Sequence, residues 1–344
     1  MSVVYLLGAG FSAPLGIPVI KTFIEKSKDQ MRAEPTRYQY FQRVFDLIQG
    51  LYKANHFFDS DVSNIEEVLS LLQADAMVSK TELTAEVIRY ICDVVTYNTP
   101  LIPAPPKPPP SDWQGYPFGG GSSDWNGYGN FALALLNLRL ERDSLDTTVL
   151  VDESSRTRYA VVSLNYDLVL ENACGYMGKH YVTPKGAWGF RVLAGKRLDG
   201  VGRAVLAKLH GSIEDGMIVP PTWSKDTTPA FTDAWQEALK ALSEAQEIRI
   251  IGYSLPVSDS HIRYLLKAAA IRNPDLRRVD VLCLDDPTEQ VSKRYAEFVN
   301  LTDFKFKHGS VKDYLTILTA RLSQGVQAPS DHLEATHAHF FDRT

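Results

Sequence analysis

Short apolar runs alternate with amphipathic segments along much of the chain. Runs that are apolar at nearly every position are typical of strands buried on both faces of a parallel sheet. They lie at Val3–Leu7, Tyr159–Leu164, Ala204–Leu209, Ile248–Ile251, Val279–Leu284 and Phe304–Phe306. Segments with a helical apolar period lie at Phe231–Leu242, Asp259–Ile271, Pro287–Val299 and Val311–Leu322. This alternation predicts an α/β fold with a Rossmann-like, doubly wound parallel sheet.

The region between the first apolar run and residue 155 has a helical pattern instead. Apolar stripes at helical spacing are formed by Phe41, Val44, Phe45 and Ile48, and by Leu83, Val87, Ile91 and Val95. No convincing strand is found up to about residue 150, and Phe131–Arg142 is predicted to be helical. We therefore expect a Rossmann-like domain of residues 1–30 and 155–323, interrupted by a mainly helical insertion at residues 31–154.

Two segments lack either pattern. Prolines and then glycines crowd residues 98–130, and this density disfavours helix and sheet alike. A surface loop is the favoured interpretation; a lid or partner-docking loop is the alternative, because its Trp and Tyr side chains are costly to expose without a use. These aromatic residues are Trp113, Tyr116, Trp125 and Tyr128. Residues 324–344 predict a loose polar tail, in which His337 and His339 as metal ligands are the less favoured alternative.

Composition narrows the function classes. The formal charge of −5 over 344 residues argues against a protein that binds nucleic acid over a broad surface, which needs a basic face. The chain has three cysteines and no CxxC motif, so neither a disulfide framework nor a zinc ribbon is encoded, and Cys283 is expected to be a buried thiol. No apolar run reaches membrane length and the first residues do not resemble a signal peptide, so a cytoplasmic location is expected.

The first predicted strand ends in a glycine loop. Gly8, Ala9 and Gly10 come directly before a predicted helix, where glycines let a phosphate approach and free N–H groups face the anion. The spacing nearly satisfies GxGxxG/A, with Ala13 last, but this pattern alone is weak. A dehydrogenase would place a second strand with a terminal acidic residue some twenty residues on. Lys26–Ala33 is polar there, so a dehydrogenase is disfavoured.

Four blocks in the chain resemble, in order, the motifs of the sirtuin family. They are Gly8–Ser12 with Gly16–Pro18, Ser163–Asp167, Lys208–Ser212 and Ile251–Pro256. The first is similar to the GAGxSxxxGIP cofactor loop, and the next two resemble the T-Q-N-x-D and H-G blocks. The last resembles the segment that holds the phosphate and adenosine side of the cofactor. Each block is weak alone; four in order, each after a predicted strand, are specific.

The resemblance implies cleavage of the bond between nicotinamide and ribose in NAD. Asn165 would contact the nicotinamide ribose and position a water, Asp167 would hold the nicotinamide amide, and His210 would engage ribose hydroxyls or act as a general base. Further implied cofactor contacts are Gly8, Ala9, Gly10 and Ser12 at the pyrophosphate, Gly252 and Ser254 on the same side, and Asp285 or Asp286 at the adenosine ribose. Singly, such residues also fit turns and helix caps, and Asp259 with Arg263 fits a structural ion pair.

Three departures separate this chain from the protein-deacylating sirtuins. The four-cysteine zinc module after the H-G block is missing, Val19–Lys21 stands where Asp-Phe-Arg is usual, and Ile213–Lys225 replaces the zinc-bound substrate groove. The pattern resembles the zinc-free bacterial branch, whose members hydrolyse NAD as effectors of anti-phage defence. The resemblance thus implies a zinc-free NAD glycohydrolase that releases nicotinamide and ADP-ribose. The alternatives are an NAD-dependent protein deacylase and a non-catalytic module that senses NAD or a related nucleotide.

The resemblance also implies that the activity is gated, because depletion of NAD harms the host cell. We expect a homo-oligomer, or a separate activating partner such as a HerA-type ATPase or an Argonaute-like protein, since the sequence shows no sensing domain. Neither direct nucleic-acid binding nor membrane association is expected.

Overall fold

The structure is a computed structural model centred on one large sheet. It describes residues 1–51, 65, 67–71, 83–105, 116–143, 147–195, 197–198, 202–219, 231–257, 259–285, 287–324 and 327–342. The strands of the large sheet are β1 (Ser2–Leu7), β4 (Arg158–Ser163), β5 (Phe190–Ala194), β6 (Arg197–Leu198), β7 (Ala204–Lys208), β10 (Glu247–Ile251), β11 (Arg278–Cys283) and β12 (Phe304–His308). Their order is β12-β11-β10-β1-β4-β7-β5-β6, and all neighbours pair in parallel except β5 and β6. The predicted doubly wound parallel sheet is confirmed.

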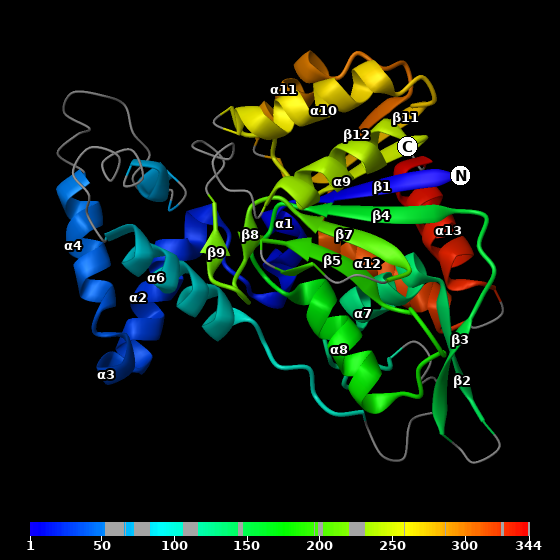
Figure 1. The fold of residues 1–344 in the computed structure, drawn as a ribbon, viewed down its shortest axis with the longest axis horizontal. Helices are drawn as coiled ribbons and strands as arrows, with labels where there is room; N and C mark the ends of the chain where they lie inside the picture. The colour runs from blue at the N-terminus through cyan, green and yellow to red at the C-terminus, as the bar shows by residue number, and fades with distance from the viewer. Residues whose placement is uncertain are drawn as a thin grey trace.

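Helices cover both faces of the sheet (Figure 1). One face is covered by α7 (Trp125–Leu136), α8 (Val169–His180), α12 (Val311–Leu322) and α13 (Pro329–Asp342), and the other by α9 (Thr232–Ser243), α10 (Ser260–Arg272) and α11 (Gln290–Phe298). The central strand shows why its sequence is apolar throughout. Val3 and Tyr5 pack into one core cluster, whereas Val4 and Leu6 pack into the cluster on the opposite face.

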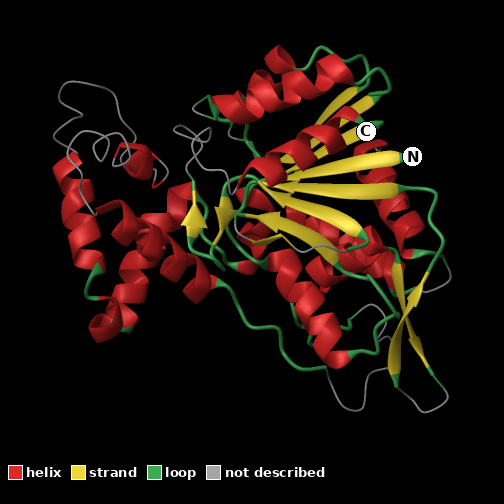
Figure 2. Cartoon of the chain, in the orientation of Figure 1, coloured by secondary structure: helices red, strands yellow, loops and turns green. Residues whose placement is uncertain are grey.

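The helical part of the chain before residue 100 forms a separate cluster beside the sheet. It contains α2 (Ile20–Ala33), α3 (Pro35–Tyr38), α4 (Phe41–Leu51) and α6 (Leu83–Asn98). The two apolar stripes expected from the sequence meet inside this cluster, where the rings of Phe41 and Tyr90 lie 4.7 Å apart at 79°. The strands point their carboxyl ends toward the cluster (Figure 2). Any site at those ends therefore lies between the sheet and the helices.

The prediction of a helix over Phe131–Arg142 is wrong beyond Leu136, and so is the absence of strands before residue 150. Asn137 takes a left-handed conformation with φ 48° and ends α7. The strands β2 (Leu138–Arg142) and β3 (Thr148–Asp152) then form an antiparallel hairpin. Helix α7 itself packs under the sheet against α8, α12 and α13, although it falls in the range assigned to the insertion.

The expected surface loop over residues 98–130 is wrong for its second part. Helix α7 begins inside it at Trp125, and the side chains of Phe118 and Trp125 are buried. Gly129 sits in this helix because a Cβ there would lie 2.1 Å from the Phe118 ring. Gly129 therefore allows close packing. Composition alone does not distinguish a glycine of this kind from one that forms a turn. Trp113 lies outside the described residues.

The expectation of a loose tail is also wrong. Pro329–Asp342 forms helix α13, whose apolar face joins the core through Leu333 and Phe341. His337 is buried, and its Nε2 lies 2.7 Å from Asp280 Oδ2. Within the described ranges, no group of three or more His, Cys, Asp and Glu side chains could hold a metal ion, so the metal alternative has no support there.

Candidate active site

Two backbone loops touch where β1 and β10 end, and their glycines allow that contact. The Gly8 N–H donates to Ile251 O at 3.0 Å, and the Gly10 N–H donates to Gly252 O at 2.8 Å. A Cβ on Gly10 would lie 2.9 Å from Gly252 Cα, and Gly252 has a φ of +68°. The chain leaves β1 toward β4 and leaves β10 toward β11, on opposite sides. This point is the topological switch at which open α/β sheets bind ligands.

The amide groups of the glycine loop do not all face outward as expected. Those of Gly8 and Gly10 hold the β10 loop, and the Phe11 N–H donates to Gly8 O at 2.9 Å. The expectation of free amides is therefore wrong for Gly8 and Gly10. The placement of a pyrophosphate beside Gly8, Ala9, Gly10 and Ser12 stays a prediction.

Asn165 joins the loop after β4 to the loop after β1. Its Nδ2 donates to Gly8 O at 3.0 Å and to Ser12 Oγ at 3.2 Å. The side chain is buried, and Oδ1 accepts no hydrogen bond within the part of the chain that the structure describes. Buried polar atoms in proteins nearly always have a partner. The open acceptor thus points to a ligand or a water at this position.

Asp167 is held in the same loop by a buried lysine. Lys208, at the end of β7, donates from Nζ to the Asp167 backbone O at 2.5 Å and to Glu171 Oε1 at 2.8 Å. Burial raises the pKa of the Asp167 carboxyl, while the charge of Lys208 and a hydrogen bond from Ser12 oppose that rise. The sequence indicates no role for Lys208; its one signal is a charge that ends an apolar run.

A small pocket opens beside these residues. Its volume is about 50 Å³, and its walls are mostly apolar. The lining residues are Ala9, Ile17, Pro18, Ile20, Phe23, Ile65, Val95, Leu164, Asn165, Tyr166 and Asp167. Asn165 and Asp167 supply its polar side chains, and Phe23, Ile65 and Val95 come from the helical part of the chain. Ligand sites commonly combine apolar walls with a few placed polar groups, and the lining of this pocket has that composition.

His210 lies near this pocket but does not line it. The residue follows β7, which pairs with the strand before Asn165, so the two predicted catalytic residues extend from neighbouring strand ends. The ring of Tyr166 lies 6.4 Å from the His210 imidazole. His210 Nε2 also lies 3.8 Å from Oδ2 of the buried Asp259, a residue that the sequence interpretation assigned to a structural pair with Arg263.

Ser254, predicted on the pyrophosphate side, and Asp285, predicted at the adenosine ribose, both have structural partners. Arg294 of α11 donates to the backbone O of Ser254 at 3.0 Å, and the sequence gives no sign of this contact. The carboxylate of Asp285 accepts the N–H groups of Val291 and Ser292 at 2.9 and 2.8 Å, and so caps the start of α11. A ribose contact of Asp285 stays a prediction, and Asp286 lies outside the described residues.

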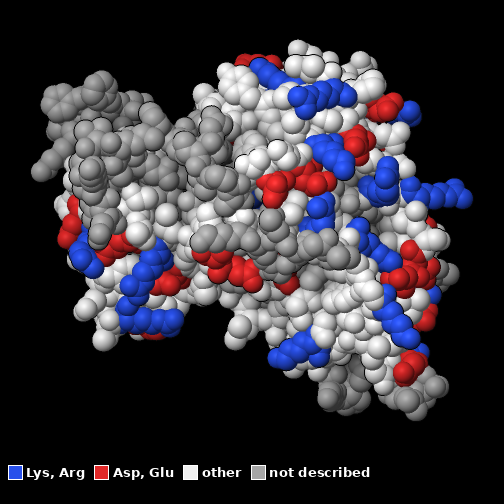
Figure 3. Space-filling view, in the orientation of Figure 1, with Lys and Arg blue, Asp and Glu red and all other residues white. Residues whose placement is uncertain are grey.

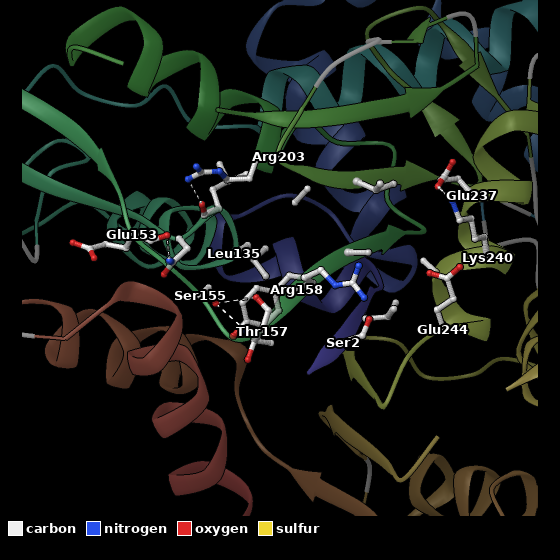
Figure 4. Close-up of a pocket in the computed structure, with 18 residues that line it drawn as sticks. Ser2, Leu135, Glu153, Ser155, Thr157, Arg158, Arg203, Glu237, Lys240 and Glu244 are labelled. Atoms are coloured by element: carbon white, nitrogen blue, oxygen red, sulfur yellow. Dashed lines mark hydrogen bonds and ion pairs between the residues drawn. The ribbon is translucent and has the colours of Figure 1, made fainter. Parts of the chain in front are cut away.

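A larger cavity lies at the opposite, amino end of the sheet (Figure 4). Its volume is about 390 Å³, and it is lined by the first residues of β1, β4 and β7. Its charged side chains are Arg158, Arg203, Lys240, Glu153, Glu237 and Glu244, three of each sign. It is remote from the glycine loop and favours neither anions nor cations, so we do not place the active site there.

The surface and the helices add two further facts. Basic and acidic side chains are interspersed over the described residues on the face drawn in Figure 3. None of the described helices combines the length and the apolar character needed to cross a lipid bilayer.

The parallel sheet, with its glycine loop at the topological switch, defines a Rossmann-like α/β protein. Residues 159–302 match the family model of the SIR2-like domain. This part of the chain is thus SIR2-like, as the sequence blocks indicate, and the match supports an NAD-utilising enzyme. A comparison with curated proteins finds no match.

Solved structures of Sir2 proteins are similar to the chain at low identity. One is a Sir2 with an inhibitor, 2'-O-acetyl-ADP-ribose and a deacetylated peptide, with 13% identity, a TM-score of 0.34 and 92% of each chain covered. Another is a Sir2 with a peptide and NAD⁺, with 12% identity, a TM-score of 0.33 and the same coverage. A mutant Sir2 homologue with 2'-O-acetyl ADP ribose has 12% identity and a TM-score of 0.36, covering 99% of this chain and 93% of that one. At these TM-scores, nothing further is inferred from the overlays.

Proposed function

We propose that the protein is an NAD glycohydrolase, which uses water to cleave NAD into nicotinamide and ADP-ribose. The observation that carries the proposal is the orientation of Asn165. Its amide nitrogen donates to Gly8 O and Ser12 Oγ, which fixes the orientation of the side chain. Its buried amide oxygen accepts no hydrogen bond from the described part of the chain. Such an oxygen can hold the attacking water or a ribose hydroxyl.

The chemistry needs few protein groups. The bond between the ribose C1' and the nicotinamide nitrogen breaks, and its electron pair leaves with nicotinamide, which becomes neutral. The water oxygen bonds to C1', and the proton it loses passes to a base. Positive charge develops on the ribose as the bond breaks, so placed acceptors and a positioned water lower the barrier. The roles proposed are ribose and water contact for Asn165, nicotinamide amide contact for Asp167, and proton acceptance for His210.

The lining of the pocket beside Asn165 and Asp167 supports this assignment of the nicotinamide end. Apolar walls from Ile17 and Pro18 fit a flat heteroaromatic ring, and the Asp167 side chain is the polar group at hand for a carboxamide. The remaining cofactor contacts proposed are Gly8, Ala9, Gly10, Ser12, Gly252, Ser254 and Asp285.

The proposal includes a zinc-free, gated effector of bacterial anti-phage defence that acts in the cytoplasm. The chain contains three cysteines and so cannot itself supply a four-cysteine zinc module. Gating would come from a homo-oligomer or from a separate partner such as a HerA-type ATPase or an Argonaute-like protein. These elements rest on the motif resemblance.

The test is to incubate the purified protein with NAD over a range of protein concentrations and to quantify nicotinamide and ADP-ribose by chromatography. We expect equal amounts of both products, and a fall in kcat of about 100-fold or more for Asn165→Ala. Asn300→Ala is the matched control, because this exposed asparagine precedes β12 at the far end of the sheet. Nicotinamide release only with an acylated peptide would instead establish a deacylase. NAD binding without turnover at every concentration would establish a sensing module.

A further inference from the structure

Two buried side chains approach each other across the carboxyl ends of the sheet. His210 follows β7, whereas Asp259 precedes α10 in the loop after β10, and β1 and β4 lie between these two strands. His210 Nε2 and Asp259 Oδ2 are 3.8 Å apart, and the side chains are 3% and 2% exposed. The separation is longer than a hydrogen bond and within the distance of an ion pair.

Asp259 is held in place by neighbours on its own loop. The Tyr253 hydroxyl donates to Asp259 Oδ2 at 2.8 Å, and the Ile262 N–H donates to Oδ1 at 3.5 Å. Tyr253 directly follows Gly252, whose backbone contacts the glycine loop after β1. The carboxylate is thus anchored to the switch point of the sheet, next to the proposed site.

Capping of α10 does not account for a buried negative charge. Ser310 caps α12 with a neutral hydroxyl, which accepts from the Lys312 N–H at 3.1 Å. Asparagine and serine are as good at this position as aspartate. Burial of a carboxylate is costly unless a donor or a positive charge compensates it. The Tyr253 hydroxyl and the Ile262 N–H are neutral donors to this carboxylate, and a histidine that becomes positively charged in the reaction adds a positive charge beside it.

We propose that Asp259 is a positioning residue for His210, an inference that rests on the proposed function. The Asp259 carboxylate lies on the Nε2 side of the His210 ring, so its negative charge favours the neutral tautomer protonated at Nε2, with the lone pair on Nδ1. During NAD cleavage Nδ1 takes the proton released by the attacking water or by a ribose hydroxyl. The imidazolium that forms is stabilised by the Asp259 carboxylate, and the proton later passes to solvent.

The experiment compares the wild-type chain with Asp259→Asn, which keeps the size and the capping oxygen but removes the charge. Long-range proton–nitrogen NMR of labelled histidine reports the His210 tautomer, with His210→Ala used to assign the signal. We expect the Nε2–H tautomer in the wild type and a shift toward Nδ1–H in the variant. We also expect kcat to fall about 10- to 100-fold with KM within about threefold, because the orienting group and not substrate contact is lost. Ser310→Ala, which removes a cap remote from His210, should change neither readout.

The outcomes separate this inference from the proposed function. An unchanged tautomer in Asp259→Asn overturns the inference, and so does an unchanged kcat in an active enzyme. If the wild type does not cleave NAD, the proposed function fails while the tautomer still tests the pairing. If Asp259→Asn does not fold, Tyr253→Phe provides the same NMR test, because it removes the hydroxyl that orients Asp259 and keeps the ring.

Discussion

Two clusters of buried polar side chains lie on the same central strands, and they differ in whether the protein supplies their hydrogen-bond and ion-pair partners. One is the candidate site at the carboxyl ends. The other, here called the α13 network, consists of Tyr5, Arg249, Asp280, Glu334 and His337 beneath helix α13. In that network Arg249 contacts Glu334 at 2.6 Å and Tyr5 at 2.9 Å. Its charged groups are paired within the protein.

The charged groups of the α13 network are paired with one another, although Asp280 Oδ1 accepts no hydrogen bond from the described residues. The charge and hydrogen bonds of Arg249 hold the pKa of Glu334 below its usual value, although burial acts in the opposite direction. Burial and the nearby Arg249 hold the pKa of His337 well below its usual value, so the ring is neutral against Asp280. Such a network stabilises the docking of a helix.

The candidate site differs from the α13 network because a pocket borders its unpartnered oxygen. The Asn165 oxygen accepts no hydrogen bond from the described residues, and the pKa of Asp167 is raised by burial despite the nearby Lys208. A pocket borders both side chains. Burial of polar side chains alone therefore does not indicate a functional site. A functional site is indicated where a buried polar group lacks a partner and lies next to a pocket that a ligand could occupy.

The largest expected effect comes from Gly252→Ala. Gly252 has φ +68°, and a Cβ there would lie 2.2 Å from the Phe11 backbone N, so the two loops must separate. We expect a loss of about 3 kcal/mol or more in the free energy of unfolding, together with loss of NAD binding in titration calorimetry.

The matched control for this change is Gly186→Ala. Gly186 has φ +88° with nothing within 4 Å of an added Cβ, so it carries the conformational strain without the clash. It should lose only about 1 kcal/mol and keep NAD binding. Equal effects of the two changes would show that the contact between the loops is unimportant.

The sheet and much of the candidate site can be predicted from the sequence, whereas the α13 network cannot. The uninterrupted apolar strands predict the sheet, and the four motif blocks are predicted to lie along one edge of it, because the carboxyl ends of parallel strands share an edge. One of these blocks supplies both Asn165 and Asp167, which line the pocket. Strand β5 and helix α8 were not predicted. Asp259 was interpreted only as part of a helix start, because its partner His210 is 49 residues away in the sequence.

The α13 network could not be predicted, because its meaning depends on tertiary pairing. The segment around Glu334 and His337 is polar. Because the sequence does not show that Arg249 and Asp280 pair with these side chains, it predicts a loose tail there. The glycines of α7 mislead for the same reason, because Gly129 leaves space for Phe118 and Gly127 leaves space for Leu315 of α12. The local pattern of apolar and polar residues predicts which positions are buried and whether a segment is helix or strand. It does not predict which buried charged side chains pair in the folded protein.

A smaller effect is expected from breaking the α13 network with Glu334→Gln. Arg249 loses one charged partner at 2.6 Å and keeps Glu247 at 2.7 Å, so the variant should lose about 2 kcal/mol in urea unfolding at neutral pH, as for a hydrogen bond to a charged group. The kcat for NAD cleavage should be unchanged at temperatures where the variant is folded. A large fall in kcat with unchanged stability would show that the α13 network belongs to the site.

The smallest expected effect is a pH dependence of the free energy of unfolding, which has opposite signs in the two clusters. The pKa of Glu334 is lowered from 4.5, so its stabilisation is present above that pH and is lost as the pH falls through the folded-state pKa. The pKa of Asp167 is raised from 3.8, so its relative stabilisation is present below that pH and is lost as the pH rises through the folded-state pKa.

Urea unfolding of Asp167→Asn and Glu334→Gln across acidic and neutral pH measures both signs as differences from the wild type, in which the other titrating groups cancel. The deficit of Glu334→Gln should shrink toward acidic pH, because the wild-type carboxyl then becomes neutral too. Asp167→Asn should gain stability relative to the wild type as the pH rises, because the asparagine carries no charge to bury. If both differences had the same sign of slope, the Asp167 carboxyl would be as well paired as Glu334, and the distinction between the two clusters would not hold.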